Sequence, residues 1–251
     1  MFKKLLFKFA KGTIIGEFVG TAFRYGSWAI PMKKVYNGKG ILAFYHPCPS
    51  YENHIIISPK RAIKNLQQME LECYSKYFVQ IFEVTKDISM MHPEYNDSFA
   101  IVANGGKRQE VQQVHFHMFT NHEIVKEYFA GEQAEGVVYS DRDICILEHP
   151  EPNWEIHFVI QSNAPFPITE KEKERYFRSV LHGIDLLDDE FDIVQRGYSL
   201  IYRCGNMQDS DKGAVFHVVS GRKTKDIQYN RTKVLANYEK KLYTKKWRWR
   251  L

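Results

Sequence analysis

A chain of 251 residues with 44% hydrophobic and 14% aromatic side chains can bury a full core, which excludes a disordered or fibrous protein. No apolar run reaches the roughly 18 to 20 residues that a membrane-spanning helix needs, and the four cysteines are scattered without a C-x-x-C pair that would indicate a zinc knuckle or a redox dithiol. The net charge of +5 is uneven, because residues 1–11 carry four lysines and residues 231–251 carry eight Lys or Arg against one acid. The body of the chain is therefore acidic, and we expect a soluble, cytoplasmic protein without a broad cationic face.

The two basic ends each leave two interpretations open. At the N-terminus, apolar residues recur at helical spacing between lysines, which predicts an amphipathic helix that either lies on an anionic membrane surface or covers the core. At the C-terminus, Trp247 and Trp249 alternate with Arg248 and Arg250. This mixture suits contact with nucleic acid or anionic lipid, and it equally suits a terminal helix that packs on the body.

An internal repeat organises the rest of the chain. The segment "YNGKGILAFYHPCPSYENHIII" from Tyr36 aligns without gaps with "YSDRDICILEHPEPNWEIHFVI" from Tyr139, at a constant offset of 103. The identical pairs are Tyr36/Tyr139, Ile41/Ile144, His46/His149, Pro47/Pro150, Pro49/Pro152, Glu52/Glu155, His54/His157 and Ile57/Ile160. Each copy predicts a strand, a proline-rich turn and a second strand.

A helix and two further strands follow in each copy. Apolar residues at steps of three or four predict a helix over residues 74–88, and Thr169 with Glu172 forms a capping-box pattern that starts the second helix. The strands are "SFAIVANGG" and "VQQVHFHMF" in the first copy, and "GYSLIYRCG" and "GAVFHVVSG" in the second. An offset of 100 aligns His217 with His117 but places Val215 at the position of His115.

The last strand of the first copy concentrates the chemistry. If residues 111–119 form one strand, Gln113, His115 and His117 share one face while Val114 and its apolar partners share the other. The loop before this strand, "NGGKRQE", contains glycines, Lys107 and Arg108, which suit close approach to a phosphate.

These residues resemble a known family. "VANGGKRQEVQQVHFHMF" resembles the signature segment of the histidine-triad superfamily of nucleotidyl hydrolases and transferases, whose motif reads H-x-H-x-H-x-x with apolar residues at x. "ILAFYHPCPSYENHIIISPKRAI" is similar to that family's first hairpin, and the tandem layout resembles galactose-1-phosphate uridylyltransferase. The resemblance implies an α+β fold in which two histidine-triad-like modules form one extended antiparallel sheet with packed helices.

The resulting domain map has five parts. They are a basic amphipathic N-terminal arm (1–34), a catalytic module (35–125), a linker (126–136), a degenerate second module (137–222) and a basic aromatic C-terminal tail (223–251).

The resemblance also implies a mechanism. His115 would attack the α-phosphorus of a nucleotide and form a covalent nucleotidyl-histidine intermediate, and His117 would hydrogen-bond the phosphate or relay a proton. The expected substrate-binding residues are Gln113, Asn104, Gln109, Lys107 and His46. The chain departs from the family pattern at three of its positions. Gln113 stands at the first triad position, His46 stands where an aspartate commonly binds ribose, and Glu110 stands where a small hydroxyl residue is usual.

The reaction class depends on the residue two positions after the nucleophile. Uridylyltransferases of the superfamily carry glutamine there and hydrolases carry histidine, so His117 favours a nucleotidyl hydrolase, while the tandem layout favours a nucleotidyltransferase. Two further functions stay open: a metal-binding sheet with His115 and His117 as ligands, and a catalytically inactive nucleotide-binding protein. No cofactor and no metal is expected for the enzyme, its partner is a nucleotide or nucleotide conjugate, and the oligomeric state is left open.

Overall fold

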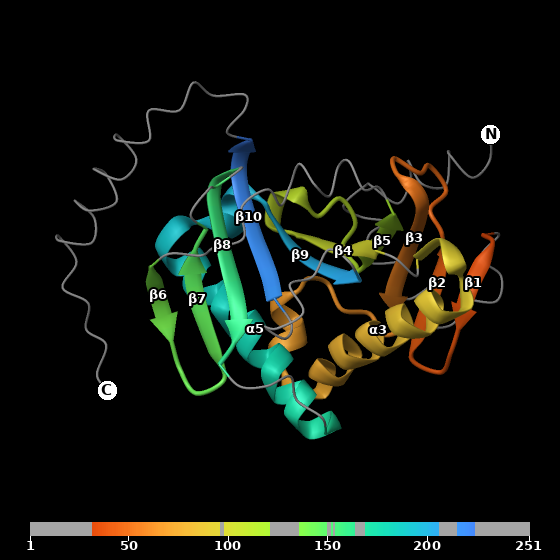
Figure 1. Ribbon diagram of the computed structural model, residues 1–251, viewed down its shortest axis with the longest axis horizontal. Coiled ribbons are helices and arrows are strands. Elements are labelled where there is room, and N and C mark those ends of the chain that lie inside the picture. The colour runs from red at the N-terminus through yellow and green to blue at the C-terminus, as the bar shows by residue number, and fades with distance from the viewer. Residues whose placement is uncertain are drawn as a thin grey trace.

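A ten-stranded antiparallel sheet is the centre of the fold. The computed structural model describes residues 32–95, 98–120, 136–149, 152, 154–163, 169–205 and 215–223. The strand order is β1-β2-β3-β5-β4-β9-β10-β8-β7-β6, so the second half of the sheet repeats the first in reverse (Figure 1). The strands are β1 (Lys34–Asn37), β2 (Ile41–Tyr45), β3 (Glu52–Pro59), β4 (Ser98–Gly105), β5 (Phe116–Thr120), β6 (Val137–Ser140), β7 (Ile144–Glu148), β8 (Trp154–Ser162), β9 (Tyr198–Gly205) and β10 (Val215–Lys223).

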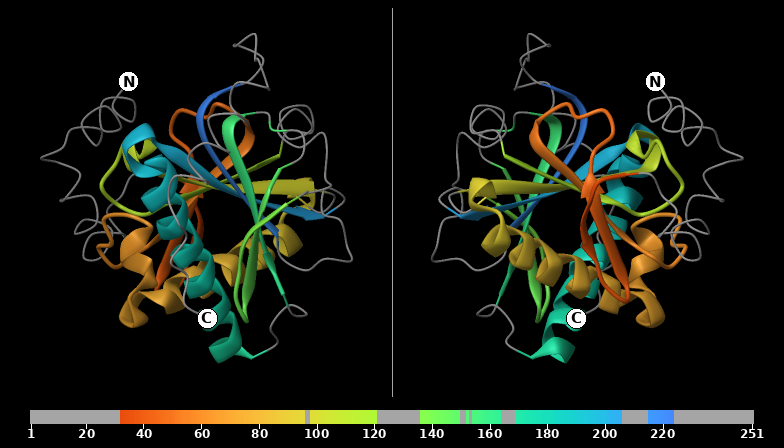
Figure 2. Two further views of the ribbon diagram at one scale, coloured as in Figure 1. Left: turned by 90° about the vertical axis from the view of Figure 1, so that its left-hand side faces the viewer. Right: turned by 90° about the vertical axis from the view of Figure 1, so that its right-hand side faces the viewer.

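Two long helices pack on one face of this sheet (Figure 2). They are α3 (Glu72–Met91) and α5 (Glu170–Phe191), and the shorter helical segments are η1 (Gln67–Glu70), η2 (Pro93–Tyr95), η3 (Gly106–Arg108) and α6 (Ile193–Arg196). The predicted capping box is present at the start of α5, where the Thr169 side chain accepts from the Glu172 N–H and the Glu172 carboxylate accepts from the Thr169 N–H.

One hydrophobic core joins the two modules beneath the sheet. Phe78 of α3 lies against Phe177 of α5 with ring centroids 4.6 Å apart, and it also contacts Phe116 of β5 and Phe216 of β10 at 5.4 and 6.1 Å. Aromatic side chains from both copies therefore occupy the same core.

The two modules also share the sheet. At the junction β4 pairs with β9 over eight residues, from Ser98 opposite Gly205 to Gly105 opposite Tyr198. This pairing hides one strand edge of each module, as an unpaired edge would invite association. The predicted α+β fold with two modules in one extended antiparallel sheet is thus confirmed.

Some details differ from the sequence-based expectation. Each module begins with an extra short strand, β1 or β6, which forms an outer edge of the sheet. The strand expected over residues 111–119 begins only at Phe116, because residues 111–113 form a turn in which the Gln113 N–H donates to the Val111 carbonyl (2.8 Å). Gln113 and His115 therefore precede the strand.

The expected N-terminal arm, the linker and the C-terminal tail lie almost wholly outside the described residues. No helix within the described ranges is long and apolar enough to cross a membrane.

Candidate active site

Four histidines of the first module lie together on the sheet face that is opposite the helices. Phe116 and Met118 of β5 are buried in the core, so alternation along the strand leaves His117 on the other face. His115 directly precedes β5 and its neighbours Val114 and Phe116 are both buried in the core, whereas His115 and His117 are half-buried. They are joined by His54 of β3 and by His46, which directly follows β2. The ring centroids of His115 and His117 are 4.9 Å apart, and those of His54 and His117 are 5.0 Å apart.

The ring of His115 is held by a backbone carbonyl. Its Nδ1 lies 2.7 Å from the Gln113 carbonyl oxygen. Since a carbonyl can only accept a hydrogen bond, Nδ1 carries the proton and donates it, and the lone pair of the neutral ring is on Nε2. A nucleophilic nitrogen is thereby fixed on one side of the ring.

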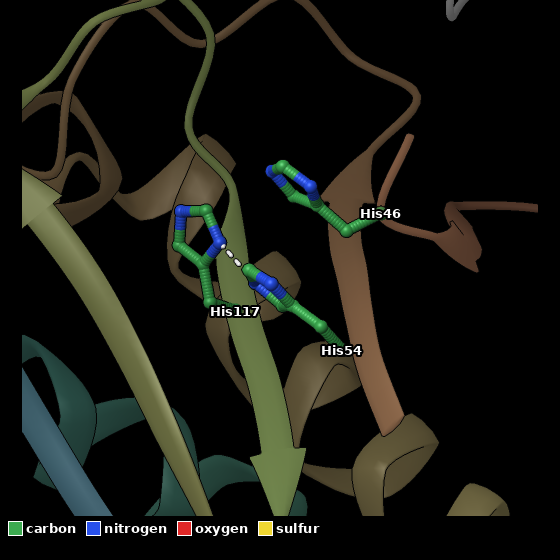
Figure 3. A group of neighbouring side chains, drawn as sticks. All are labelled: His46, His54 and His117. Carbon is green, nitrogen blue, oxygen red and sulfur yellow. Dashed lines mark hydrogen bonds between the residues drawn. The ribbon is translucent and has the colours of Figure 1, made fainter. Parts of the chain in front are cut away.

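A second hydrogen-bonded chain orients His117. The Ser50 N–H donates to His54 Nδ1 (3.4 Å), so the proton of a neutral His54 is on Nε2, which lies 2.8 Å from His117 Nδ1 (Figure 3). His117 Nδ1 therefore accepts, and its own proton is on Nε2. The ring that carries this N–H donor lies beside that of His115, with ring centroids 4.9 Å apart.

His46 is oriented by the turn that it begins. The Cys48 N–H donates to His46 Nδ1 (3.0 Å), which leaves the proton on Nε2. Its ring stacks on that of His54, with centroids 4.2 Å apart and planes 9° apart. Figure 3 shows the three rings of His46, His54 and His117 on the same side of the strands.

Burial keeps these rings neutral. Desolvation and the neighbouring His46 and His115 lower the pKa of His54 to about 3. Desolvation, followed by the other histidines, lowers the pKa of His117 well below its ordinary value. Desolvation also lowers the pKa of His115, although the Gln113 carbonyl and Glu110 act in the opposite direction. At pH 7 His54, His115 and His117 are therefore uncharged.

Two predicted substrate-binding residues have structural partners instead of facing this group. Gln113 is 1% exposed, and its amide accepts from the Ile63 N–H (3.3 Å) and donates to the carbonyls of Pro59 (3.1 Å) and Arg61 (3.0 Å). The expectation that it lies on the open face is wrong, because these contacts, about fifty positions away in sequence, bury it. Gln109 donates to the carbonyls of Lys64 and Val111 (2.8 Å).

Two further predicted residues, Asn104 and Lys107, lie beside or within η3. Asn104 lies near the end of β4 and its Oδ1 accepts from the Ser199 hydroxyl (2.8 Å), while Lys107 is exposed. Arg108, expected to suit a phosphate, is directed to the second module, where it donates to Ser199 Oγ and to the carbonyls of Val219 (3.2 Å) and Gly221 (2.8 Å). No local pattern indicates this role, because all of these partners lie more than 90 positions away.

The second module contains a matching histidine group. His149 stacks on His157 (4.0 Å between centroids, planes 11° apart), and His157 Nε2 lies 3.0 Å from His217 Nδ1. All three residues are buried, and the buried Arg203 places Nη2 3.2 Å from His217 Nε2. Val215 occupies the position that His115 has in the first module.

Both groups contain enough nitrogens to be considered as metal sites. In each, one ring nitrogen per histidine lies within 4.8 Å of the others: His46, His54 and His117, and His149, His157 and His217. A histidine ligand offers an unprotonated nitrogen and carries its proton on the other one. In His46 and His54 backbone N–H groups already donate to Nδ1, which places the protons on the nitrogens that a metal would need. The hydrogen bonds of the first group therefore fit a group of donors better than a group of ligands.

Comparison with known proteins identifies relatives of the first module. The family model of the HIT (histidine triad) domain matches residues 28–124. An uncharacterized HIT-like protein from Methanocaldococcus jannaschii is 32% identical over 99 residues, which are 38% of this chain and 72% of that protein.

Solved structures extend the likeness to both modules. ADP-glucose phosphorylase from Arabidopsis thaliana, solved with bound ADP-glucose, is similar with a TM-score of 0.55 at 6% identity, over 80% of this chain and 81% of that one. A uridylyltransferase gives a TM-score of 0.51 at 10% identity, over 74% of both chains. At such low identity these structures establish the common fold. Together with the sequence match over the first module, they lead to one conclusion: the chain belongs to the HIT family, in a two-module form like that of the uridylyltransferases.

Proposed function

We propose that the protein is a nucleotidyl hydrolase that uses His115 as its nucleophile. The observation that carries the proposal is the hydrogen bond from His115 Nδ1 to the Gln113 carbonyl, which leaves the Nε2 lone pair of a neutral ring on the open face of the sheet. A neutral imidazole is nucleophilic, and the lowered pKa of His115 keeps it neutral at pH 7.

The reaction has two displacement steps. First, His115 Nε2 forms a bond to the α-phosphorus while the bond from phosphorus to the leaving oxygen breaks, and the leaving group departs with that electron pair. The imidazolium character that develops on His115 is stabilised through its Nδ1–H by the Gln113 carbonyl. In the second step a water oxygen bonds to phosphorus, the N–P bond breaks and the lone pair returns to Nε2, while the proton of the water passes to solvent.

His117 and His46 supply hydrogen bonds to the substrate in this proposal. His117 Nε2–H donates to an oxygen of the attacked phosphate, and His54 keeps that proton in place by donating to His117 Nδ1. His46 Nε2–H is a second donor on the same face, with its ring centroid 5.8 Å from that of His117. Asn104 and the exposed Lys107 border the same loop. Gln109 and Gln113 act indirectly, since their side chains hold the chain that leads to His115.

A nucleotide as substrate is supported by the family and by the fold. HIT family membership and a fold like that of ADP-glucose phosphorylase both favour nucleotide chemistry. The likeness to uridylyltransferase supports a second candidate, a nucleotidyltransferase in which a phosphate or sugar phosphate replaces water in the second step.

Labelling of the intermediate tests the proposal. Purified full-length protein is incubated with α-³²P-labelled ADP-sugar, dinucleoside tetraphosphate or nucleoside phosphoramidate, and the label is assayed on denatured protein. We expect a label that is acid-labile and base-stable, as a phosphohistidine is, and that is absent from His115→Ala. The matched control His217→Ala alters the corresponding group of the second module and should label like the wild type. A label that persists in His115→Ala contradicts the assignment of the nucleophile, and release of the label to water or to an added acceptor separates the hydrolase from the transferase.

A further inference from the structure

The loop that precedes the nucleophile is bound to the second module through Arg108. Arg108 Nη1 donates to Ser199 Oγ (3.2 Å) and to the Val219 carbonyl (3.2 Å), and Nη2 donates to the Gly221 carbonyl (2.8 Å). These acceptors belong to β9 and β10. One planar guanidinium therefore ties η3 to two strands of the other module, with two nitrogens held in a fixed geometry that a lysine ammonium does not have.

A stacking contact adds a third strand to this anchor. The Arg108 guanidinium carbon lies 4.4 Å from the ring centroid of Trp154, the first residue of β8. At this distance a cation is attracted by the electron-rich face of the indole. The flat guanidinium is thus held by its edge through hydrogen bonds and by its face through the ring.

The backbone of the loop touches the second module as closely as the side chain does. Gly106 has a φ of +56°, and a Cβ added there would meet the carbonyl oxygen of Val194 in α6. Gly197 has a φ of +80°, and a Cβ added there would lie 2.7 Å from the backbone nitrogen of Arg108. Both glycines are needed for conformation and for space, so the backbones of η3 and of the segment around α6 lie in close contact.

The anchor continues to the strand beside the nucleophile. Ser199 Oγ, which accepts from Arg108, donates to Asn104 Oδ1 (2.8 Å). Asn104 directly follows Ala103, which pairs with Phe116, the residue after His115. Two hydrogen bonds thus connect Arg108, through Ser199 of the second module, to Asn104, whose neighbour Ala103 lies opposite Phe116 in the sheet.

We propose that Arg108 is a positioning residue, which fixes η3 and Asn104 against the phosphate attacked by His115. The inference rests on the proposed function. In the second module Val215 occupies the position of His115. The second module then serves as a rigid support for the loop that precedes His115. In this arrangement the charge of Arg108 is used between the modules and does not bind the substrate.

Kinetics of the full chain test the positioning role. We expect Arg108→Ala to lower kcat about 10²-fold, since small displacements of a catalytic loop have effects of this size, while KM changes by less than about threefold because Arg108 does not touch the substrate. Added guanidinium at millimolar concentration should restore at least tenfold of the loss, and Arg108→Lys should remain impaired. Ser199→Ala, which removes the bridge to Asn104, should lower kcat in the same direction by a smaller factor.

A matched control uses the neighbouring Arg196. Arg196 Nη1 forms an exposed ion pair with Glu155 (2.9 Å), which joins α6 to β8 within the second module. Arg196→Ala should keep kcat within about twofold of the wild type, because exposed ion pairs contribute little. Equal effects of Arg196→Ala and Arg108→Ala, or a kcat of Arg108→Ala equal to that of the wild type, would overturn the proposal.

Hydrogen–deuterium exchange tests the anchoring of η3 by Arg108, called the clamp below, without any substrate. In Arg108→Ala the amides of residues 106–111 should exchange at least tenfold faster than in the wild type, while those of β2 and β3 keep their protection. Unchanged exchange in this segment would overturn the clamp even if kcat fell. Faster exchange in a protein that forms no labelled intermediate supports the clamp and refutes the proposed function, so the two failures are distinguishable.

Discussion

The two modules contain the same three histidines, but the hydrogen bond between the central pair runs in opposite directions. In the first module the Ser50 N–H fixes the direction, so His54 Nε2–H donates to His117 Nδ1. In the second module the Arg203 guanidinium can only donate to His217 Nε2, so His217 Nδ1–H donates to His157 Nε2. His117 thus keeps an N–H for a ligand, whereas the corresponding nitrogen of His217 is already used.

The strand register shows that Arg203 of the second module and Asn104 of the first module occupy equivalent positions. His117 pairs with Val102 and His217 pairs with Ile201, and two residues further along these strands are Asn104 and Arg203. One substitution at equivalent positions therefore separates an open donor group from a closed one. Identical histidines therefore do not suffice to form an open donor group, because a neighbouring residue outside the group sets the direction of their hydrogen bonds.

The largest expected difference between the modules concerns the nucleophile position. His115→Ala should lower kcat on the order of 10³-fold or more, because the covalent step has no substitute. Val215→Ala, at the equivalent position, should leave kcat within about twofold, because Val215 lies outside the reacting group. Steady-state hydrolysis of a nucleotide substrate measures both, and a similar loss in the two variants would place the chemistry elsewhere.

The next effect concerns the third triad position. His117→Ala should lower kcat about 10²–10³-fold through loss of a donor to the phosphate. His217→Ala should leave kcat unchanged but lower the free energy of unfolding by about 1–3 kcal/mol, since it leaves the buried Arg203 without this acceptor. Urea unfolding and kinetics on the same preparations measure both variants. A loss of stability in His117→Ala but not in His217→Ala would contradict the expected difference between the two histidines.

Both histidine groups should make the stability of the protein sensitive to acid. The folded-state pKa of His54 is about 3, and those of His117, His157 and His217 lie well below 6.5, so the unfolded chain takes up protons that the folded chain does not. Stability is therefore complete above about pH 6.5 and is lost as the pH falls through the histidine range. Each double variant, His157→Gln/His217→Gln and His54→Gln/His117→Gln, should therefore flatten the pH dependence of the unfolding free energy relative to the wild type. A slope in urea unfolding between about pH 7 and pH 4 that stays the same as in the wild type would contradict this expectation.

The smallest effect is a change of tautomer. ¹⁵N chemical shifts of the imidazoles should assign the proton to Nε2 in His54 and His117 and to Nδ1 in His217. In Arg203→Asn, which introduces the residue found at the equivalent position of the first module, the His217 proton becomes free to move to Nε2. If His217 is already protonated on Nε2 in the wild type, the hydrogen bonds of the two histidine pairs do not run in opposite directions.

Much of the fold was predictable because its signals are local or repeated. The offset of 103 indicated two modules, and the Thr169–Glu172 capping box indicated the start of α5. The position of His117 on the face opposite the core followed from strand alternation. The misplacement of Gln113 came from extending a strand through residues that a tertiary contact with Ile63 bends into a turn.

The parts of the site that the sequence did not predict all depend on partners that are remote in the chain. His54 is indicated only by its repetition as His157, and its bond to His117 spans 63 positions. Arg108 has the local features of a phosphate-binding residue, yet its acceptors are 91 to 113 positions away. A tautomer cannot be read from composition or spacing, because it depends on which donor reaches the other ring nitrogen.

The covalent connection of the two modules has an evolutionary consequence. In a symmetric dimer of identical chains, every substitution is made twice, so a change that closes one site closes the other. In this chain the eight-residue β4–β9 pairing provides the same mutual support while each half mutates independently. If His115 is the nucleophile, as proposed, the second half is free to serve as the support of the first, and Val215 and Arg203 are the positions at which it departs from the first half.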